Sequence, residues 1–110
     1  MKDYLLLFRG GLNFQTAAPD QLQQTLGKWK DWIDMLTTDG RYGGGQRVTR
    51  TGKVLRGKSI VVTEGPYAEG EIVGGHITLK ANSIDEAVEI AKGCPIFNFD
   101  GICEVREIAV

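Results

Sequence analysis

The order of apolar patterns constrains the fold of this chain more than any single motif does. A nearly continuous apolar run at Tyr4–Phe8 indicates a buried strand. Apolar residues then recur every three or four positions from Leu22 to Leu36, which is typical of one face of a helix. Short β-branched segments follow, and Ile72–Ala81 is the longest strand candidate. A second helical pattern and a final strand at Ile102–Ile108 complete the chain.

Both expected helices carry end signals. Pro19 and Asp20 suit the first turn of the first helix, and Gly40 supplies its stop. The second helix starts with Ser83-x-x-Glu86, which is a capping box. The resulting order, β-α-β(hairpin)-β-α-β, predicts an α+β fold: a ferredoxin-like βαββαβ sandwich with an extra hairpin.

The first strand is apolar on both of its faces. One face carries Tyr4, Leu6 and Phe8, and the other carries Leu5 and Leu7. A monomer with this fold would keep the helix-free face of its sheet polar, because a large exposed apolar patch is rare in monomers. We therefore expect a homodimer that packs two such faces together; the alternative is that loops of the same chain cover the face.

Composition excludes several classes of function. The chain, expected to be one domain over residues 1–110, has a net charge of −1 and so no long-range field for nucleic acid or an acidic membrane. Basic residues cluster in the middle of the chain, but glycines separate them, which favours a solvated hairpin over a weak anion site. The basic residues are Arg41, Arg47, Arg50, Lys53, Arg56 and Lys58.

Neither a membrane span nor a metal site is expected. No segment approaches the roughly 20 apolar residues that a span needs, and the N-terminal apolar run is too short for a signal peptide. A cytoplasmic location follows as the expectation. Cys94 and Cys103 fit neither a zinc site nor a redox motif, so we expect no metal, no cofactor and no disulfide.

The segment Glu64–Glu71 reads Glu-Gly-Pro-Tyr-Ala-Glu-Gly-Glu and runs directly into the longest strand candidate. Proline locks φ and pushes its neighbour out of the helical region, so Gly65-Pro66 is a turn or an extended corner. Tyr67 therefore lies on a loop, where functional residues concentrate. This loop resembles the signature loop of the YCII-related family, also called DGPF-domain proteins, with Glu64 in place of its Asp and Tyr67 in place of its Phe.

The resemblance covers nearly the whole chain. Further matching features follow in order: the Trp-rich helix ending in Asp39-Gly40-Arg41, Gly74-Gly75, Ser83–Ala87, Cys94-Pro95 and Glu104–Arg106. It implies a dimeric α+β barrel with a cavity between each sheet and its partner elements. Some related proteins resemble lactone isomerases and carry a proposed His–Asp pair, whose histidine belongs in or near the first helix. That stretch, Gly27–Trp32, contains no histidine here, so the pair is not carried over.

His76 is the only histidine and the only candidate for a catalytic residue. It alternates with Ile77 and Leu79, so if those two residues face the helices, His76 and Thr78 point to the dimer-side face. General acid or base catalysis is one interpretation of His76. A structural or partly exposed histidine is the alternative.

Five residues are candidate ligand-binding positions: Arg9, Trp32, Glu64, Tyr67 and Thr78. The helical stripe predicts Trp29 in the core and Trp32 off its centre, where it is the better of the two for stacking on a ligand. Glu64, Glu69 and Glu71 crowd one loop, where close carboxylates could form a base or hold a cation; the alternative is that they are exposed loop acids.

The sequence supports two main interpretations of function. The first is a small dimeric protein that binds a small hydrophobic or aromatic ligand in the barrel cavity. The second is a small enzyme of the lactone-isomerase or dehydratase kind that uses His76. A third, weaker interpretation is an accessory domain in sigma-factor-linked regulation, since related domains can accompany such proteins.

Overall fold

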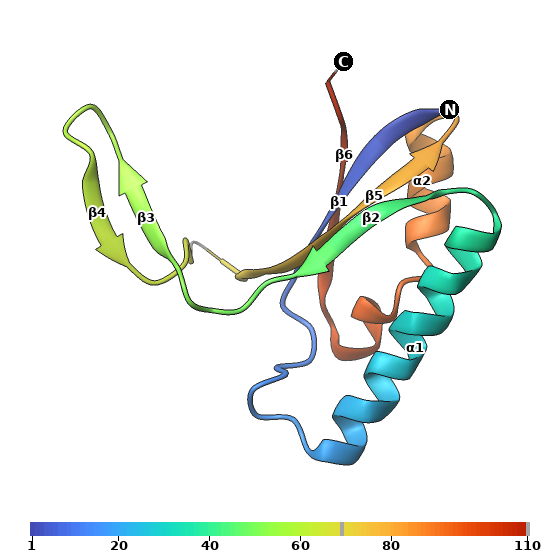
Figure 1. Ribbon diagram of the computed structural model, residues 1–110, viewed down its shortest axis with the longest axis horizontal. Helices are drawn as coiled ribbons and strands as arrows, with labels where there is room; N and C mark the ends of the chain where they lie inside the picture. Colours follow the sequence, from blue (N-terminus) through green and yellow to red (C-terminus); the bar gives the residue numbers. More distant parts are fainter. Residues whose placement is uncertain (69, 110) are drawn as a thin grey trace.

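The structure, a computed structural model, describes residues 1–68 and 70–109 (Figure 1). Within this part of the chain there are six strands, two α-helices and one short 3-10 helix. In order these are β1 (Lys2–Arg9), α1 (Pro19–Thr38), β2 (Tyr42–Arg47), β3 (Lys53–Arg56), β4 (Val61–Glu64), β5 (Val73–Ala81), α2 (Ile84–Ala91), η1 (Pro95–Phe99) and β6 (Ile102–Glu107). The predicted α+β class is therefore confirmed.

Four of the strands form one antiparallel sheet in the order β2-β5-β1-β6. Both helices cover the same face of this sheet (Figure 1). Every second residue of the central strands β1 and β5 is buried on that face, as the two-residue period of a strand requires. The buried core residues are Tyr4, Leu6, Phe8, Trp32, Leu36, Ile77, Leu79, Ala81, Ala87, Ala91, Cys94 and Ile96.

Helix α1 begins and ends where its sequence signals indicate. Pro19 is its first residue, and Gly40 lies just beyond its end with φ of +72°, a conformation that favours glycine. The prediction for the two tryptophans was wrong. Trp32 is buried, at 6% exposure, whereas Trp29 is only partly buried. The C-terminal half of α1, with fully buried Leu36, packs on the sheet, while Trp29 faces a cavity further towards the N-terminus of the helix.

The predicted cap of α2 is confirmed, with one difference. The Ser83 hydroxyl accepts a hydrogen bond from the Glu86 N–H at 3.1 Å. The Glu86 carboxylate accepts from the N–H of Asn82, one residue before the cap, and pairs with Arg41 at 2.6 Å. The Asn82 hydrogen bond and the Arg41 guanidinium hold the pKa of Glu86 below its ordinary value.

The face of α2 that meets the sheet consists of small side chains. Ala87 and Ala91 are buried, but Ile84 and Val88 are exposed. Small side chains alone let the helix lie close to the strands, and the two larger ones border a shallow apolar depression with Phe97.

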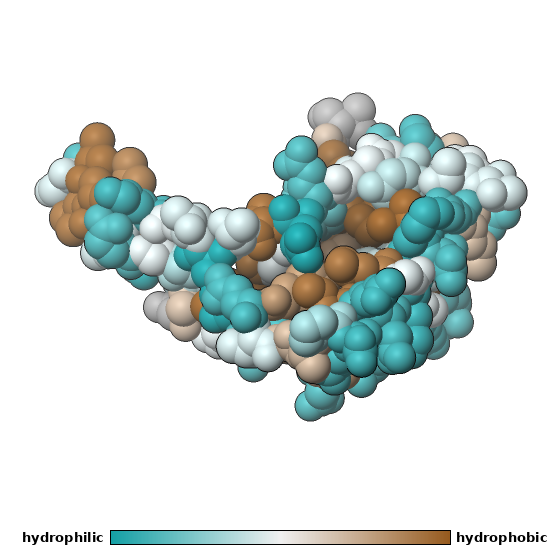
Figure 2. All heavy atoms as spheres, turned by 60° about the horizontal axis from the view of Figure 1, so that its bottom comes forward, coloured by the Kyte–Doolittle hydropathy of each residue, from teal (hydrophilic) through white to brown (hydrophobic). Residues whose placement is uncertain are grey.

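Strands β3 and β4 form a separate two-stranded sheet, which we call the hairpin arm (residues 53–64). The arm projects away from the body on the side of the sheet opposite the helices (Figure 1). Its large apolar side chains are exposed: Leu55 and Ile60 at 62%, Val61 at 55% and Val62 at 52%. Figure 2 shows them as a separate apolar patch at the far end of the molecule. The apolar side chains of the arm are therefore not covered by helices as those of the body are. An isolated two-stranded hairpin of this kind is marginally stable in water.

The helix-free face of the sheet carries the alternate residues of the central strands. Leu7 pairs with His76, and Leu5 pairs with Thr78. All four side chains are partly exposed, whereas Ile77 is buried under the helices. The predicted orientation of His76 towards the helix-free side is therefore confirmed.

Candidate functional site

A cavity of about 590 Å³ lies beside the N-terminal half of α1, at the end of the sheet where β1 enters the following loop. The loop 10–15, the ends of β2 and β5 and the residues around η1 form its other walls. Figure 2 shows a hollow with apolar residues at its centre and polar residues around it. A volume of this size is typical of sites that take a small molecule.

Glycines on the strands make room for this cavity. Gly75 pairs with Phe8 on one side and with Arg47 on the other, and paired residues share a face of the sheet. This row across the sheet therefore consists of Phe8, Gly75, which has no side chain, and Arg47. A Cβ atom at position 75 would lie 2.9 Å from the carbonyl oxygen of Gln46, so the backbones approach too closely for a side chain.

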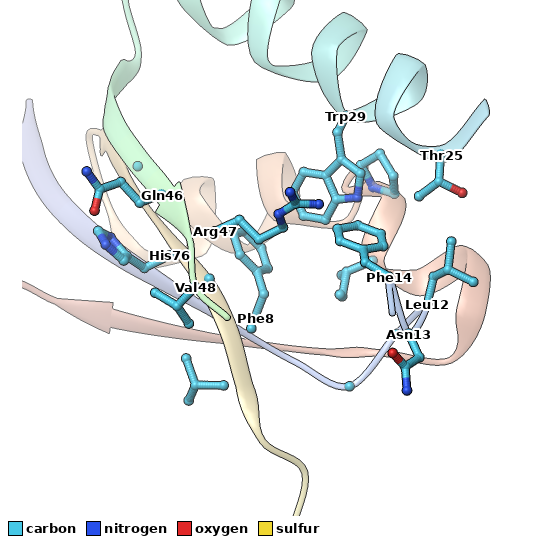
Figure 3. A pocket seen from close by; sticks show the side chains of 18 of the residues that line it. Phe8, Leu12, Asn13, Phe14, Thr25, Trp29, Gln46, Arg47, Val48 and His76 are labelled. Atoms are coloured by element: carbon cyan, nitrogen blue, oxygen red, sulfur yellow. The ribbon is translucent and has the colours of Figure 1, made fainter. Parts of the chain in front are cut away.

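Aromatic side chains form the apolar walls. The rings of Phe8 and Trp29 meet edge to face, with centroids 5.0 Å apart. Phe14 comes from the loop before α1, and Phe99 comes from η1. Figure 3 shows Phe8, Phe14 and Trp29 converging on one space from three different elements. A flat apolar molecule would find rings on several sides there.

Polar side chains also line the cavity around these rings. The guanidinium carbon of Arg47 lies 4.6 Å from the centre of the Phe14 ring, a cation–π contact. Arg50, Glu71 and the buried Thr25 also line the cavity. In a pocket with apolar walls, polar groups such as these fix the orientation of a bound ligand.

His76 lies at the far edge of the same cavity. Its cross-strand neighbour on β2 is Gln46. Figure 3 shows His76, Gln46 and Val48 on the side of the strands away from Trp29. His76 is therefore at the point where the cavity reaches the helix-free face of the sheet.

Two other candidates lie on the helix-free face. Arg9 pairs with Glu104 of β6, with 3.5 Å between Nη2 and Oε1. Thr78 lies opposite Leu5 on the neighbouring strand. Trp32 lies in the core instead; its indole N–H is buried and has no hydrogen-bond partner among the described residues.

The Gly-Pro loop places its candidates at the hairpin arm. Glu64, the last residue of β4, pairs with Lys53 at 3.1 Å. Tyr67 is half-exposed and lies under the Arg56 guanidinium, 5.1 Å from the ring centre. Glu69 is outside the described residues, and Glu71 lines the cavity. The structure therefore does not bring Glu64 and Tyr67 together with His76 in one site.

Sequence reasoning missed the residues that form the cavity walls, above all Phe14, Trp29 and Arg47. Phe14 was not among the candidate residues, and Trp29 was assigned to the core. Arg47 was counted among basic residues of a solvated hairpin. A usable signal was its place: it ends a glycine-rich strand beside the Gly74-Gly75 pair, where a missing side chain leaves room.

Cys94 is buried and Cys103 is partly buried. Burial raises the pKa of Cys94 to about 12 and that of Cys103 to about 11. Within residues 1–68 and 70–109, no three His, Cys, Asp or Glu side chains gather closely enough to hold a metal ion. No helix in the same part of the chain is long and apolar enough to cross a membrane.

Fold and cavity together define a small α+β protein with one candidate site for a small molecule. The family model of the YCII-related domain matches residues 12–110. The chain belongs to the YCII-related family, as the sequence resemblance indicated. A comparison with curated proteins gave no match.

Proposed function

We propose that this protein is a homodimeric, ferredoxin-like α+β barrel that binds a small hydrophobic or aromatic ligand in its cavity. The observation that carries the proposal is the cavity of about 590 Å³ with rings on several sides. Apolar walls of this kind favour a ligand whose apolar surface leaves water on binding. The strand order β2-β5-β1-β6 with both helices on one face supports the ferredoxin-like sandwich.

Binding is tested with N-phenyl-1-naphthylamine, a neutral aromatic probe whose fluorescence rises in apolar surroundings. We expect saturable binding at one site per chain. Phe14→Ser removes a ring from the cavity wall and is expected to weaken binding by roughly tenfold or more, since stacked rings contribute about 1 kcal/mol or more. Phe97→Ser is the matched control, because Phe97 is an exposed ring away from this cavity. Equal affinities of the two variants, or no saturable binding, would contradict the proposal.

Two uncovered apolar surfaces support the homodimer. Leu5 and Leu7 lie half-exposed on the helix-free face, and the hairpin arm projects on that same side (Figure 1). A second copy packed on this side would cover both surfaces at once, which a ligand of the cavity's size cannot do. Sedimentation velocity at micromolar concentration is expected to show a dimer. A monomer across that range would refute the assembly and leave the ligand proposal standing.

A second candidate function is a small lactone-isomerase- or dehydratase-like enzyme that uses His76. The observation that favours it is the place of His76 at the edge of the cavity beside Gln46. If the protein is an enzyme, a panel of aromatic and aliphatic lactones and hydroxy acids will include one that it turns over. His76→Ala then costs ~100-fold or more, as the loss of a general acid or base does. If it only binds, His76→Ala changes probe affinity a few-fold and no compound is turned over.

A further inference from the structure

Arg47 is the only cation that lies against the aromatic wall of the cavity in the described part of the chain. It is the last residue of β2, where it pairs with Gly75 of β5, and its side chain reaches Phe14 in the loop before α1. The guanidinium rests on the Phe14 ring, 4.6 Å from its centre (Figure 3). A planar ligand stacked on the rings of this wall would place its edge next to this guanidinium.

The charges around Arg47 leave it available to an anion. None of the ion pairs among the described residues involves Arg47 or Arg50, which both line the cavity. The one described carboxylate in the lining, Glu71, lies against Gly10 and forms no ion pair with Arg47. The cation–π contact that holds Arg47 is weak at an exposed site, so it competes little with a charged ligand group.

The position of the cation also suits the physics of an amphipathic ligand. Arg47 is exposed at the mouth, whereas Phe8 is buried at the floor. An anionic group held at the mouth keeps part of its hydration, so the cost of burying a charge is small there. The ring system of the same ligand fills the apolar interior. The guanidinium offers paired N–H donors that match a carboxylate or sulfonate.

We infer that the ligand of this cavity is a planar aromatic acid, and that Arg47 selects its anionic group. This inference rests on the proposed ligand-binding function and names the ligand class. Arg47 thereby acts as a specificity residue: it discriminates between two molecules with the same rings and different charge. The rings of Phe14 and Trp29 bind both molecules alike.

A matched pair of fluorescent probes tests this. 8-Anilinonaphthalene-1-sulfonate and N-phenyl-1-naphthylamine share their ring system, and only the first carries a sulfonate. Arg47→Met keeps the length and apolar contacts of the side chain and removes its charge. It is expected to weaken binding of the sulfonate roughly tenfold, as for one lost charge-assisted hydrogen bond, and to change binding of the neutral probe less than about twofold. Raising the salt concentration is expected to weaken only sulfonate binding to the unmodified protein.

Two controls keep the outcome clear. Arg56→Met removes a cation that also rests on a ring, that of Tyr67, but on the hairpin arm; it is expected to leave both affinities unchanged. Arg47→Lys keeps the charge without the planar fork and is expected to lie between the unmodified protein and Arg47→Met. Thermal melts of each variant establish that it is folded.

The outcomes separate the two proposals. Suppose that the neutral probe binds, and that Arg47→Met weakens the binding of both probes equally or of neither probe. The inferred ligand class, an aromatic acid, is then wrong, although the cavity still binds aromatic molecules. If Arg56→Met weakens the sulfonate as much as Arg47→Met does, the anion is held by general surface charge and the inference is overturned. If neither probe binds, the proposed function fails together with the inference.

Discussion

The body of the protein and its hairpin arm use the same kinds of residues with opposite results. In the body, apolar residues of β1 and β5 are buried against two helices; Leu6 and Leu79 have no exposed surface. In the arm, Leu55 and Val62 face each other across β3 and β4, and both remain more than half-exposed. The comparison teaches that strand pairing satisfies the backbone in both regions, whereas apolar burial is completed only in the body. The apolar surface of the arm is therefore left uncovered by the described residues of this chain.

The reaction rate of thiols is expected to differ more between the body and the arm than any other property considered below. Burial raises the pKa of Cys94 to about 12 and that of Cys103 to about 11, so at pH 8 both remain protonated. Ser59→Cys adds an exposed thiol at the turn of the arm. With Ellman's reagent at pH 8, this thiol is expected to react roughly 100-fold faster or more than the two native ones, since the thiolate is the nucleophile.

Denaturation supplies the control for the thiol experiment. In urea all three thiols are expected to react at similar rates, because unfolding removes the difference in burial. Fast reaction of Cys94 in the native protein would mean that the body opens as readily as the arm, and the contrast between them would not hold.

Core truncation is expected to show the next largest effect. Leu79→Ala removes a fully buried side chain from β5 and is expected to lower the free energy of unfolding by about 2–5 kcal/mol. Leu55→Ala is the same substitution in the arm, and in the monomer it is expected to cost less than about 1 kcal/mol. Urea unfolding at a protein concentration below the dimer dissociation constant measures both. Equal costs would show that the arm is folded on to the body in solution.

Polar substitutions in the arm test whether a second copy of the chain covers its apolar side chains. Leu55→Ser with Val62→Ser removes the apolar pair from one face of the arm. If a second copy covers that face, the dimer dissociation constant is expected to rise roughly tenfold or more, because buried interface side chains contribute about 1 kcal/mol or more each. Sedimentation equilibrium measures this change.

The opposite face of the arm provides a matched control for that experiment. Val54 and Thr63 form the neighbouring cross-strand pair. Substituting both with Ser is expected to leave dimerisation nearly unchanged. An unchanged dissociation constant for the Leu55 and Val62 variant would show that the partner does not contact this apolar face.

The smallest expected effect lies in the body, at the cap of α2. The folded-state pKa of Glu86 is lowered, so its contribution to stability is present above the ordinary glutamate pKa and is lost as the pH falls through the folded-state value. Glu86→Gln is therefore expected to lower Tm slightly at pH 7, and this difference is expected to shrink as the pH falls below the ordinary glutamate pKa of about 4.3. Glu89→Gln, which loses only an ion pair with Lys92 at the end of the same helix, is expected to change Tm less. A difference that stays constant from pH 7 into acid would contradict this account of Glu86.

Much of the fold followed from local signals. The end signals at Pro19, Gly40 and Ser83 each placed a helix end to within a residue or two. The hairpin was also expected, and in the structure Ile60 lies in its turn with φ of +54°. These features depend on neighbouring residues, which is why spacing and composition were enough.

The candidate site was much less predictable. Trp32 was expected to meet a ligand, yet it is Trp29 that lines the cavity, because only the N-terminal half of α1 stands away from the sheet. Tyr67 was expected at the site because it lies on the Gly-Pro loop. In the structure its ring contacts Arg56 of the arm instead of the aromatic wall of the cavity. Neither outcome is encoded in local spacing, because each depends on where two distant segments meet.

The sequence by itself determined the order of strands and helices, the ends of the helices, and the side of β5 on which His76 lies. Only the tertiary structure decided that Arg47, Phe14 and Trp29 meet around one cavity and that the arm stands apart from the body. The physical reason is the range of the interactions. Periodicity and capping act over a few residues and set which face of an element a side chain occupies. Strand pairing and core packing join segments far apart in the chain, and they decide which faces meet.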